Sequence, residues 1–379
     1  MAPVLIWVMS TISKIATPLL VTSALLLGLA APAAAAAAPA PANFEPASVS
    51  FPSATTGFVL GEVPCGMADC PSVVTTANGG RTWTSVTAPP AAFLEPAEQQ
   101  PQSISEVIFA NSTDGWAFGP ALWATTNGGA SWSAEKIGGP VIEMAAAGRS
   151  AFAVVASCSQ SSGTCNHPTD KVEKTPVGSD SWAPVAGLTG AGTMGAFFAT
   201  SGSTVFVALW PTSTAKAWIW RSANGTTWQR HSEACFQPSQ AIDLAGLAAP
   251  TSTTLFELCA GNPGAGQEGK YVEVSTNGGA SAHVVGKLPL GGLTDGFAAP
   301  TVGDVSVGAA SGATLIYHSV NGARTWSAKT FNDGGAGLTD LQFAGARLGA
   351  VVEGRPGIGG SDRLWLSRDG GNNWSAVNF

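Results

Sequence analysis

The feature that most constrains the fold is a short turn-like phrase that recurs along the chain at a nearly constant spacing. It reads TTANGGRTW up to Trp83 and TTNGGASW up to Trp132, and related segments end at Trp182, Trp228, Ala282, Trp326 and Trp374. Successive copies are between 44 residues (from 282 to 326) and 54 residues (from 228 to 282) apart. A repeat of this length predicts an array of small supersecondary units, none of which can bury its apolar face alone.

The segments between the phrases are strand-like. In the second unit SEVIFA, GWAFG, LWAT and SWSAEK are short runs of β-branched and aromatic residues, interrupted by glycine, asparagine and serine. Only 11% of the residues are charged, against about 25% in an ordinary soluble protein, which argues against long charged helices. Four antiparallel strands, A to D, in each of seven units predict an all-β, seven-bladed β-propeller over residues 43–379. Its blades should end near residues 87, 136, 186, 232, 286, 330 and 379.

The phrase itself falls between strands C and D, where the chain must reverse. Asparagine or aspartate followed by glycine accepts positive φ, and the preceding serine or threonine can bond turn amides. The tryptophan begins strand D and offers a large apolar face, so its loss at Ala282 should leave blade five less well packed. We therefore expect a structural role for the turn residues Asn78, Asn127, Asn224, Asn277, Asn321, Asp369, Trp83, Trp132, Trp182, Trp228, Trp326 and Trp374.

The pattern (S/T)-x-(D/N)-G-G-x-x-W resembles the Asp-box, or BNR, repeat of sialidases, sortilin-like receptors and related secreted propellers. The longer line TDGWAFGPALWATTNGGASW is most similar to repeats of the photosystem II assembly-factor family and its bacterial relatives. The resemblance covers all seven units and implies a bacterial propeller in which the turns lie far from the ligand site. It departs from the pattern because asparagine fills the acidic position in most copies.

Residues 1–42 differ in composition from the rest of the chain. After Lys14 an apolar run, IATPLLVTSALLLGLA, leads into APAAAAAAPAPA, which has the form of a secretory signal peptide with its cleavage region. Cleavage is expected between Ala34 and Ala42, which would make the protein extracellular. The alternative is retention by an uncleaved anchor, because the run approaches the length of a membrane span.

The six cysteines of an exported chain should pair, and their spacing favours three disulfides. The expected pairs are Cys65 with Cys70, Cys158 with Cys165, and Cys235 with Cys259. A zinc site is not expected, because there is no CxxC and the four histidines are scattered singly. No cofactor is expected either.

Recognition should occur on one face of the propeller. Loops from B to C and from D to the next A share one face, opposite the repeat turns, and the long connections and all six cysteines belong to it. These connections are Val63–Ser72, Pro89–Ser103, Ser157–Lys171, Pro211–Lys216, Ala260–Lys270 and Gly354–Arg363. The candidate binding residues on this face are Trp210, Glu95, Glu98, Asp170, Glu268, Arg355 and Asp362. The alternative, without a recognition role, is that the disulfides only protect flexible loop insertions from proteolysis.

These features favour a non-catalytic binding or scaffold module for an extracellular protein or glycan, acting as a monomer. The formal net charge of −7 argues against a nucleic-acid partner, and no membrane partner is expected beyond the signal peptide. The alternative is a glycoside hydrolase that uses two carboxylates of the loop face. Asp69 is a further candidate for such a pair, beside the acids named above. The resemblance to sialidases implies an arginine cluster and a tyrosine nucleophile, whereas the only tyrosines, Tyr271 and Tyr317, lie in C strands shortly before repeat turns.

Overall fold

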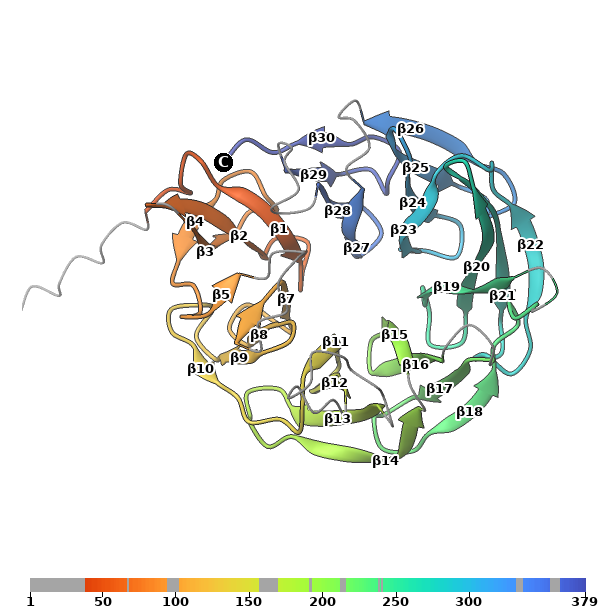
Figure 1. Ribbon diagram of the computed structural model, residues 1–379, viewed down its shortest axis with the longest axis horizontal. Helices are drawn as coiled ribbons and strands as arrows, with labels where there is room; N and C mark the ends of the chain where they lie inside the picture. Colours follow the sequence, from red (N-terminus) through yellow and green to blue (C-terminus); the bar gives the residue numbers. More distant parts are fainter. Residues whose placement is uncertain are drawn as a thin grey trace, which may run out of the picture. The chain divides into compact units, whose positions relative to one another are not determined.

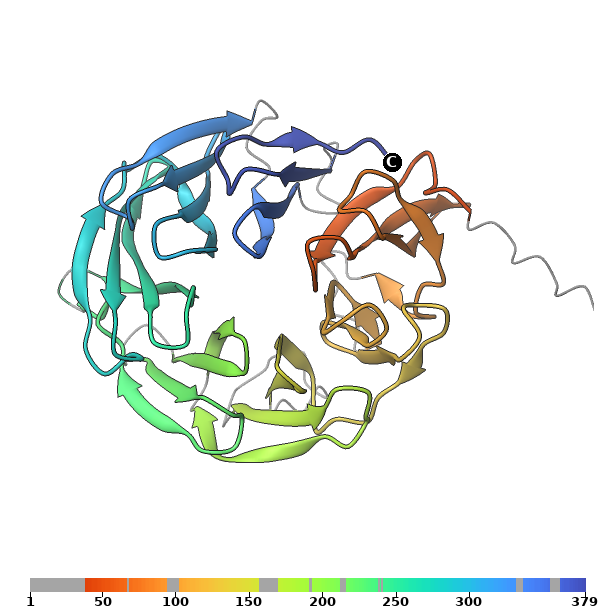
Figure 2. The ribbon, with the colours of Figure 1, turned by 180° about the vertical axis from the view of Figure 1, so that it is seen from behind.

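Seven four-stranded antiparallel sheets stand around a common axis in the computed structural model of the protein (Figures 1 and 2). The structure describes residues 38–66, 68–93, 102–156, 170–190, 193–211, 216–237, 239, 241–331, 337–354 and 362–379. In every sheet the first strand of the unit lies nearest the axis and the fourth lies outermost. The predicted all-β, seven-bladed propeller is thereby confirmed. Within the described residues there is no helix with the length and apolar character of a membrane span.

Each of the first four blades follows the chain outward from strand A to strand D. Blade one has β1 (Glu45–Ser50), β2 (Gly57–Cys65), β3 (Ala68–Thr76) and β4 (Thr84–Val86). Blade two has β7 (Glu106–Phe109), β8 (Gly115–Phe118), β9 (Leu122–Thr125) and β10 (Ser133–Ala134). Blade three has β11 (Val141–Ala147), β12 (Ser150–Ala156), β13 (Asp170–Pro176) and β14 (Ala183–Gly190). Blade four has β15 (Thr193–Ser201), β16 (Thr204–Pro211), β17 (Trp218–Ser222) and β18 (Gln229–Ser232).

The last three blades repeat the same order. Blade five has β19 (Ile242–Ala248), β20 (Leu255–Gly264), β21 (Gln267–Ser275) and β22 (His283–Lys287). Blade six has β23 (Leu293–Ala298), β24 (Val305–Ala310), β25 (Thr314–Ser319) and β26 (Ser327–Phe331). Blade seven has β27 (Leu338–Ala344), β28 (Leu348–Glu353), β29 (Arg363–Ser367) and β30 (Ser375–Ala376). A small parallel pair, β5 (Ala92–Phe93) with β6 (Ser103–Ile104), lies in the connection from blade one to blade two.

The hydrophobic core lies between blades and not on the axis. Seven clusters of buried residues each join two neighbouring blades, including one that joins blade seven to blade one. The alternation of each strand supplies side chains to both of its sheet's faces. In β17, for example, Ile219 belongs to the cluster shared with blade five and Trp220 to the cluster shared with blade three. No blade can therefore bury its apolar surface without both neighbours.

Each repeat turn is held by its own polar side chains. In blade one the Thr76 hydroxyl accepts the amide of Gly80 at 2.9 Å, and Asn78 Oδ1 accepts the amides of Arg81 and Thr82 at 2.9 and 3.0 Å. Gly79 donates to the carbonyl of Thr55, at 2.7 Å, and so joins the turn to the A-to-B loop of the same blade. The A-to-B loops and the repeat turns therefore share one face, which we call the turn face.

Most of the turn asparagines use the side-chain amide in the same way. In four turns the asparagine Nδ2 donates to a serine or threonine hydroxyl four residues later, as in Asn127 to Ser131 at 2.8 Å. The turn with Asp369 has asparagine at that later position, and Asn373 Nδ2 donates to Asp369 Oδ2 at 2.7 Å. Donor and acceptor are exchanged between the two kinds of turn, so the same hydrogen bond is kept.

The ring closes without a sheet shared between the two ends of the chain. The strand β1 pairs only with β2 inside blade one, and blade seven has its own four strands. The seam is joined by side chains instead: Asp340 Oδ2 accepts the amide of Val49 at 2.9 Å, and Gln342 Oε1 accepts the amide of Phe51 at 3.0 Å. Gln342 Nε2 also donates to the carbonyl of Val49. The last residue, Phe379, adds a ring contact to Phe44, with centroids 4.7 Å apart.

The junction between blades one and two is joined by the same kind of hydrogen bond, from a strand amide to a side chain of the preceding blade. Ser48 and Ser50 in β1 accept the amides of Val107 and Phe109 in β7 at 3.0 and 2.9 Å. The inner strand of a blade has an edge with no strand partner, and its N–H groups need acceptors. Side chains from the preceding blade supply them at both junctions.

We expect Asn127→Ala to lower the free energy of unfolding by about 1–2 kcal/mol, because it removes the acceptor of the Ser131 amide and of the Thr125 hydroxyl. Asn127→Asp keeps the acceptor, and the Ser131 hydroxyl can donate to it, so its effect should stay within about 0.5 kcal/mol. Chemical denaturation of the three proteins measures the difference. Equal losses in both variants would contradict the assignment of the turn hydrogen bonds.

We expect Gln342→Ala to loosen the seam, because its hydrogen bonds to the Val49 carbonyl in β1 and to the Phe51 amide just after β1 are both lost. The expected loss of stability is about 1–3 kcal/mol, and hydrogen exchange of the β1 amides should accelerate more than that of β15. Gln229→Ala, at an exposed position of β18, is the matched control. Unchanged β1 exchange in Gln342→Ala would show that these hydrogen bonds do not hold the seam.

Candidate functional site

The B-to-C and D-to-A connections lie on the face opposite the turn face, which we call the loop face. Two disulfides lie there. Cys65–Cys70 joins the ends of β2 and β3, and Cys235–Cys259 joins the chain leaving blade four to β20 of blade five. Both pairs agree with the pairing expected from spacing, whereas Cys158 and Cys165 lie outside the described residues. The loop face is thus covalently anchored at blade one and between blades four and five.

The carboxylates predicted from the sequence are spread around the ring. Asp170, Glu268 and Asp362 lie at or beside the starts of C strands in blades three, five and seven. Asp170 and Glu268 are buried, and Asp362 is half-buried. Glu95, Glu98 and Arg355 lie outside the described residues. The backbone of Trp210 pairs with Gly195 near the loop-face end of blade four.

Glu268 has a defined partner in the connection from blade five to blade six. Its Oε1 accepts the amide of Thr294 at 2.5 Å. The neighbouring Lys270 Nζ donates to the carbonyls of Leu290 and Gly292 at 3.0 and 2.6 Å. Burial lowers the pKa of Lys270, and the Glu268 charge acts against that effect. Together the two side chains fix the course of this loop-face connection.

The axis of the ring is an open channel of about 760 Å³, lined by the inner strands of all seven blades. Glu106, Glu143, Asp295 and Asp340 line it, and no lysine or arginine is among its described lining residues. Each acid is the first or third residue of its strand, and these strands begin at the loop face. The loop-face mouth of the channel is therefore acidic.

The acids of the channel hold protons more tightly than isolated carboxyls do. The pKa of Glu143 is raised to about 8, mainly by desolvation and also by the charge of the nearby Asp340, while the hydrogen bond from the Met144 amide acts in the opposite direction. Desolvation and the charges of Glu143 and Asp340 raise the pKa of Glu106. Asp340 shows the same upward direction, mainly from desolvation, although Ser48 and the Val49 amide stabilise its charged form. Burial and mutual proximity therefore disfavour the ionised forms of these three carboxyls.

A second group of acids lies beneath the loop face between blades four and five. Glu233 accepts the amide of Ala217 at 2.5 Å, and Glu257 accepts the amide of Ala234 at 2.9 Å. Desolvation raises the pKa of both carboxyls to about 7. The Tyr271 hydroxyl donates to the Cys235 carbonyl at 3.3 Å. These groups position the segment that the Cys235–Cys259 disulfide anchors.

Trp218 is the only tryptophan with an exposed side chain among those whose side chains the structure describes. It begins β17, has 41% of its surface exposed, and lies at the loop-face end of blade four. The guanidinium of Arg230 lies over its ring, 4.2 Å from the ring centroid. A tryptophan in contact with arginine at a surface has the composition of an interaction hot spot.

Sequence reasoning did not select Trp218, because strand alternation gives it the same phase as Trp220. Trp220 is buried against blade three, whereas Trp218 lies two residues nearer the loop face and beyond that cover. The backbone places Trp210 close by, since its neighbour Leu209 pairs with Trp218. The sequence signal that could have indicated the exposure of Trp218 is its position along the strand, next to the B-to-C connection.

Within the part of the chain that the structure describes, no group of three or more His, Cys, Asp or Glu side chains has an arrangement that could hold a metal ion. The channel acids are therefore not gathered into a metal centre.

Comparison with known structures shows the fold. YCF48 from Cyanidioschyzon merolae is 17% identical with a TM-score of 0.56, over 89% of this chain and 99% of that one. YCF48 bound to D1 peptide is 17% identical with a TM-score of 0.52, over 88% and 94%. A PL25 ulvan lyase bound to -[GlcA(1-4)Rha3S]- is 8% identical with a TM-score of 0.55, over 90% and 96%. No protein-family model matches the sequence, and comparison with curated proteins gives no match. At these identities the likeness concerns the propeller fold alone.

We expect the stability of the ring to fall with rising pH because of Glu143. Its pKa is raised from 4.5 to about 8 in the folded protein, so its contribution to stability is complete below pH 4.5 and is lost as the pH rises through about 8. Glu143→Gln should therefore raise Tm by about 2–4 °C or more at pH ~9 and change it little at pH ~4. Glu45→Gln, at an exposed position of β1, is the control. An equal Tm difference at both pH values would contradict the inferred titration.

Proposed function

We propose that the chain is a secreted, non-catalytic binding or scaffold propeller that recognises an extracellular protein or glycan through its loop face. In this proposal residues 1–42 are a signal peptide, and the repeat turns belong to the Asp-box class. The observation that carries it is Trp218, exposed on the loop face with Arg230 stacked on its ring. An exposed tryptophan ring places apolar surface in water, which is unfavourable. A ligand that covers the ring would remove this surface from water and gain binding free energy.

The residues around Trp218 hold it in a fixed position, as expected for a preorganised binding surface. The ring is held by the Arg230 guanidinium, so little side-chain entropy is lost when a ligand covers it. The Cys235–Cys259 disulfide and the acids Glu233 and Glu257 fix the adjoining connection. Trp210, at the end of the paired strand, adds a second candidate aromatic at the same end of blade four.

Similar propellers support both ligand classes. A YCF48 structure has a bound D1 peptide, and an ulvan lyase structure has a bound -[GlcA(1-4)Rha3S]-. A tryptophan face can stack on a peptide side chain or on a sugar ring, so Trp218 suits either one. No lysine or arginine is among the described lining residues of the channel, which disfavours a ligand that is anionic at its centre.

The second candidate function is a glycan-acting enzyme with acid/base carboxyls on the loop face. Glu233 and Glu257 favour it, because a pKa of about 7 suits proton transfer near neutral pH. Their burial and their hydrogen bonds to backbone amides favour a structural role instead. The predicted loop-face acids Asp170, Glu268 and Asp362 belong to three different blades. A binding function therefore has the stronger support.

The test is binding of labelled protein to peptide and glycan arrays, with a panel of chromogenic glycosides assayed in parallel. Trp218→Ala should weaken binding to the array ligands by about tenfold or more, because hot-spot truncations are worth roughly 2 kcal/mol. Its Tm should change little, since the side chain is largely exposed.

Val320→Ala is the matched control, because Val320 is an exposed apolar residue on the turn face. Binding that survives Trp218→Ala but is lost in the control would overturn the loop-face assignment. Glycoside turnover that disappears in Glu257→Gln, with Tm preserved, would favour the enzyme.

A further inference from the structure

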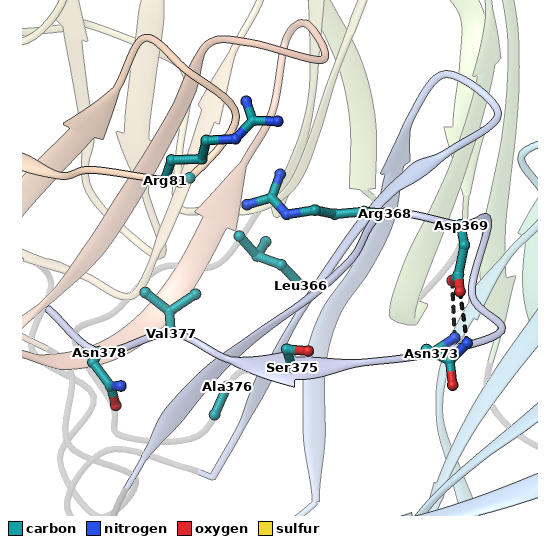
Figure 3. Close-up of a pocket in the computed structure, with 10 residues that line it drawn as sticks. Arg81, Leu366, Arg368, Asp369, Asn373, Ser375, Ala376, Val377 and Asn378 are labelled. Atoms are coloured by element: carbon teal, nitrogen blue, oxygen red, sulfur yellow. Dashed lines mark hydrogen bonds between the residues drawn. The ribbon is translucent and has the colours of Figure 1, made fainter.

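A second cavity lies on the turn face, at the seam between the first and last blades. Its volume is about 360 Å³, and it is lined by the turn of blade one and by the turn, last strand and C-terminal segment of blade seven (Figure 3). Arg81 comes from blade one and Arg368 from blade seven. This cavity is far from the loop face and has no part in the function proposed above.

The two arginines face each other across the seam. Figure 3 shows their guanidinium groups turned toward one another above Leu366 and Val377. Arg81 Nη1 donates to the carbonyl of Asn78 at 3.0 Å, which fixes its direction. Desolvation, together with the charge of Arg81, lowers the pKa of Arg368. Two cations are thus held together although they repel each other.

No carboxylate neutralises this pair within the described residues. The nearest acid in the cavity wall, Asp369, accepts the amide and the Nδ2 of Asn373 at 2.9 and 2.7 Å, and so serves its own turn (Figure 3). The one ion pair found among the described residues, between Lys171 and Glu173, is in blade three. In a chain with a net charge of −7, an unneutralised arginine pair is locally unusual.

We propose that the cavity binds a doubly charged oxyanion, a phosphate monoester or sulfate, between Arg81 and Arg368. Two planar guanidinium groups present forks of N–H donors that match tetrahedral oxyanions, and a dianion balances both charges. Leu366 and Val377 supply an apolar floor for the group that carries the anion. Because the two arginines come from the first and last blades, the bound anion also bridges the ring closure.

The chain contains a matched comparison site. Arg324 occupies the position of Arg81 in the turn of blade six, and its Nη1 donates to the carbonyl of Asn321 at 2.8 Å. The turn of the preceding blade has Thr276 where blade seven has Arg368. Arg324 therefore has the same local geometry with only one cation, and it should bind dianions weakly.

The test is a titration of the purified protein with inorganic phosphate, sulfate, phenyl phosphate and acetate at constant ionic strength, followed by calorimetry and by Tm. Wild type and Arg324→Gln should show saturable binding of phosphate and sulfate. Arg81→Gln and Arg368→Gln should each weaken it about tenfold or more, because a charge-assisted contact is lost. Arg368→Lys should be intermediate, since it keeps the charge and loses the fork.

Phosphate and sulfate also stabilise folded proteins in general, by exclusion from the surface. An equal, non-saturating rise of Tm in all variants would therefore overturn the proposal. Acetate binding as strong as phosphate binding would overturn the preference for a dianion. Tighter binding of phenyl phosphate than of inorganic phosphate would support the apolar floor, and tighter binding of sulfate than of phosphate would identify inorganic sulfate as the preferred ion. Both glutamine variants replace exposed side chains, so unchanged Tm without anion shows that they remain folded.

Discussion

The unpaired inner edge of each blade is the constraint on which the ring depends. Strand A has a partner on only one side, and its remaining N–H groups point toward the channel or the preceding blade. Ser48 and Ser50 satisfy the edge of blade two, and Asp340 and Gln342 satisfy the edge of blade one. The ring can therefore close at the chain ends by the same chemistry that joins any two of these blades.

The backbone conformation at Asp340 allows this residue to take part in closing the ring. It has a φ of 54°, in the left-handed region, at the irregularity where β27 shifts register against β28. Such a conformation is uncommon for a residue other than glycine, and the surrounding structure has to compensate for it. The irregularity lets its carboxyl bond the Val49 amide while it also lines the acidic channel. Ring closure and channel electrostatics thus share one side chain.

The two faces of the propeller differ in how their polar groups are used. On the turn face, asparagine, serine and threonine bond one another within each turn, so most of that surface is internally satisfied. On the loop face, disulfides and buried acids hold connections whose outer surface stays available, as Trp218 does. Recognition is therefore favoured on the loop face, while the seam of the turn face retains an arginine pair with no internal acid.

The sequence by itself determined the number of blades, the strands within them and the role of the turns. These follow from local spacing and local chemistry: Thr76, Asn78 and Gly80 contact one another within a few residues, so their pattern is visible in the chain. The two disulfides also followed from spacing, because their cysteines are only 5 and 24 residues apart.

Only the tertiary structure decided which side chains meet across blades. Glu106, Glu143 and Asp340 converge on the channel from three blades, and the pair Arg81 and Arg368 comes from opposite ends of the chain. No local pattern marks such pairs, because their distance depends on the curvature of the whole ring. The exposure of a tryptophan side chain could not be decided from the sequence for the same reason. Trp218 and Trp220 lie in one strand and point to the same side of the sheet, but the neighbouring blade covers Trp220 and leaves Trp218 in water.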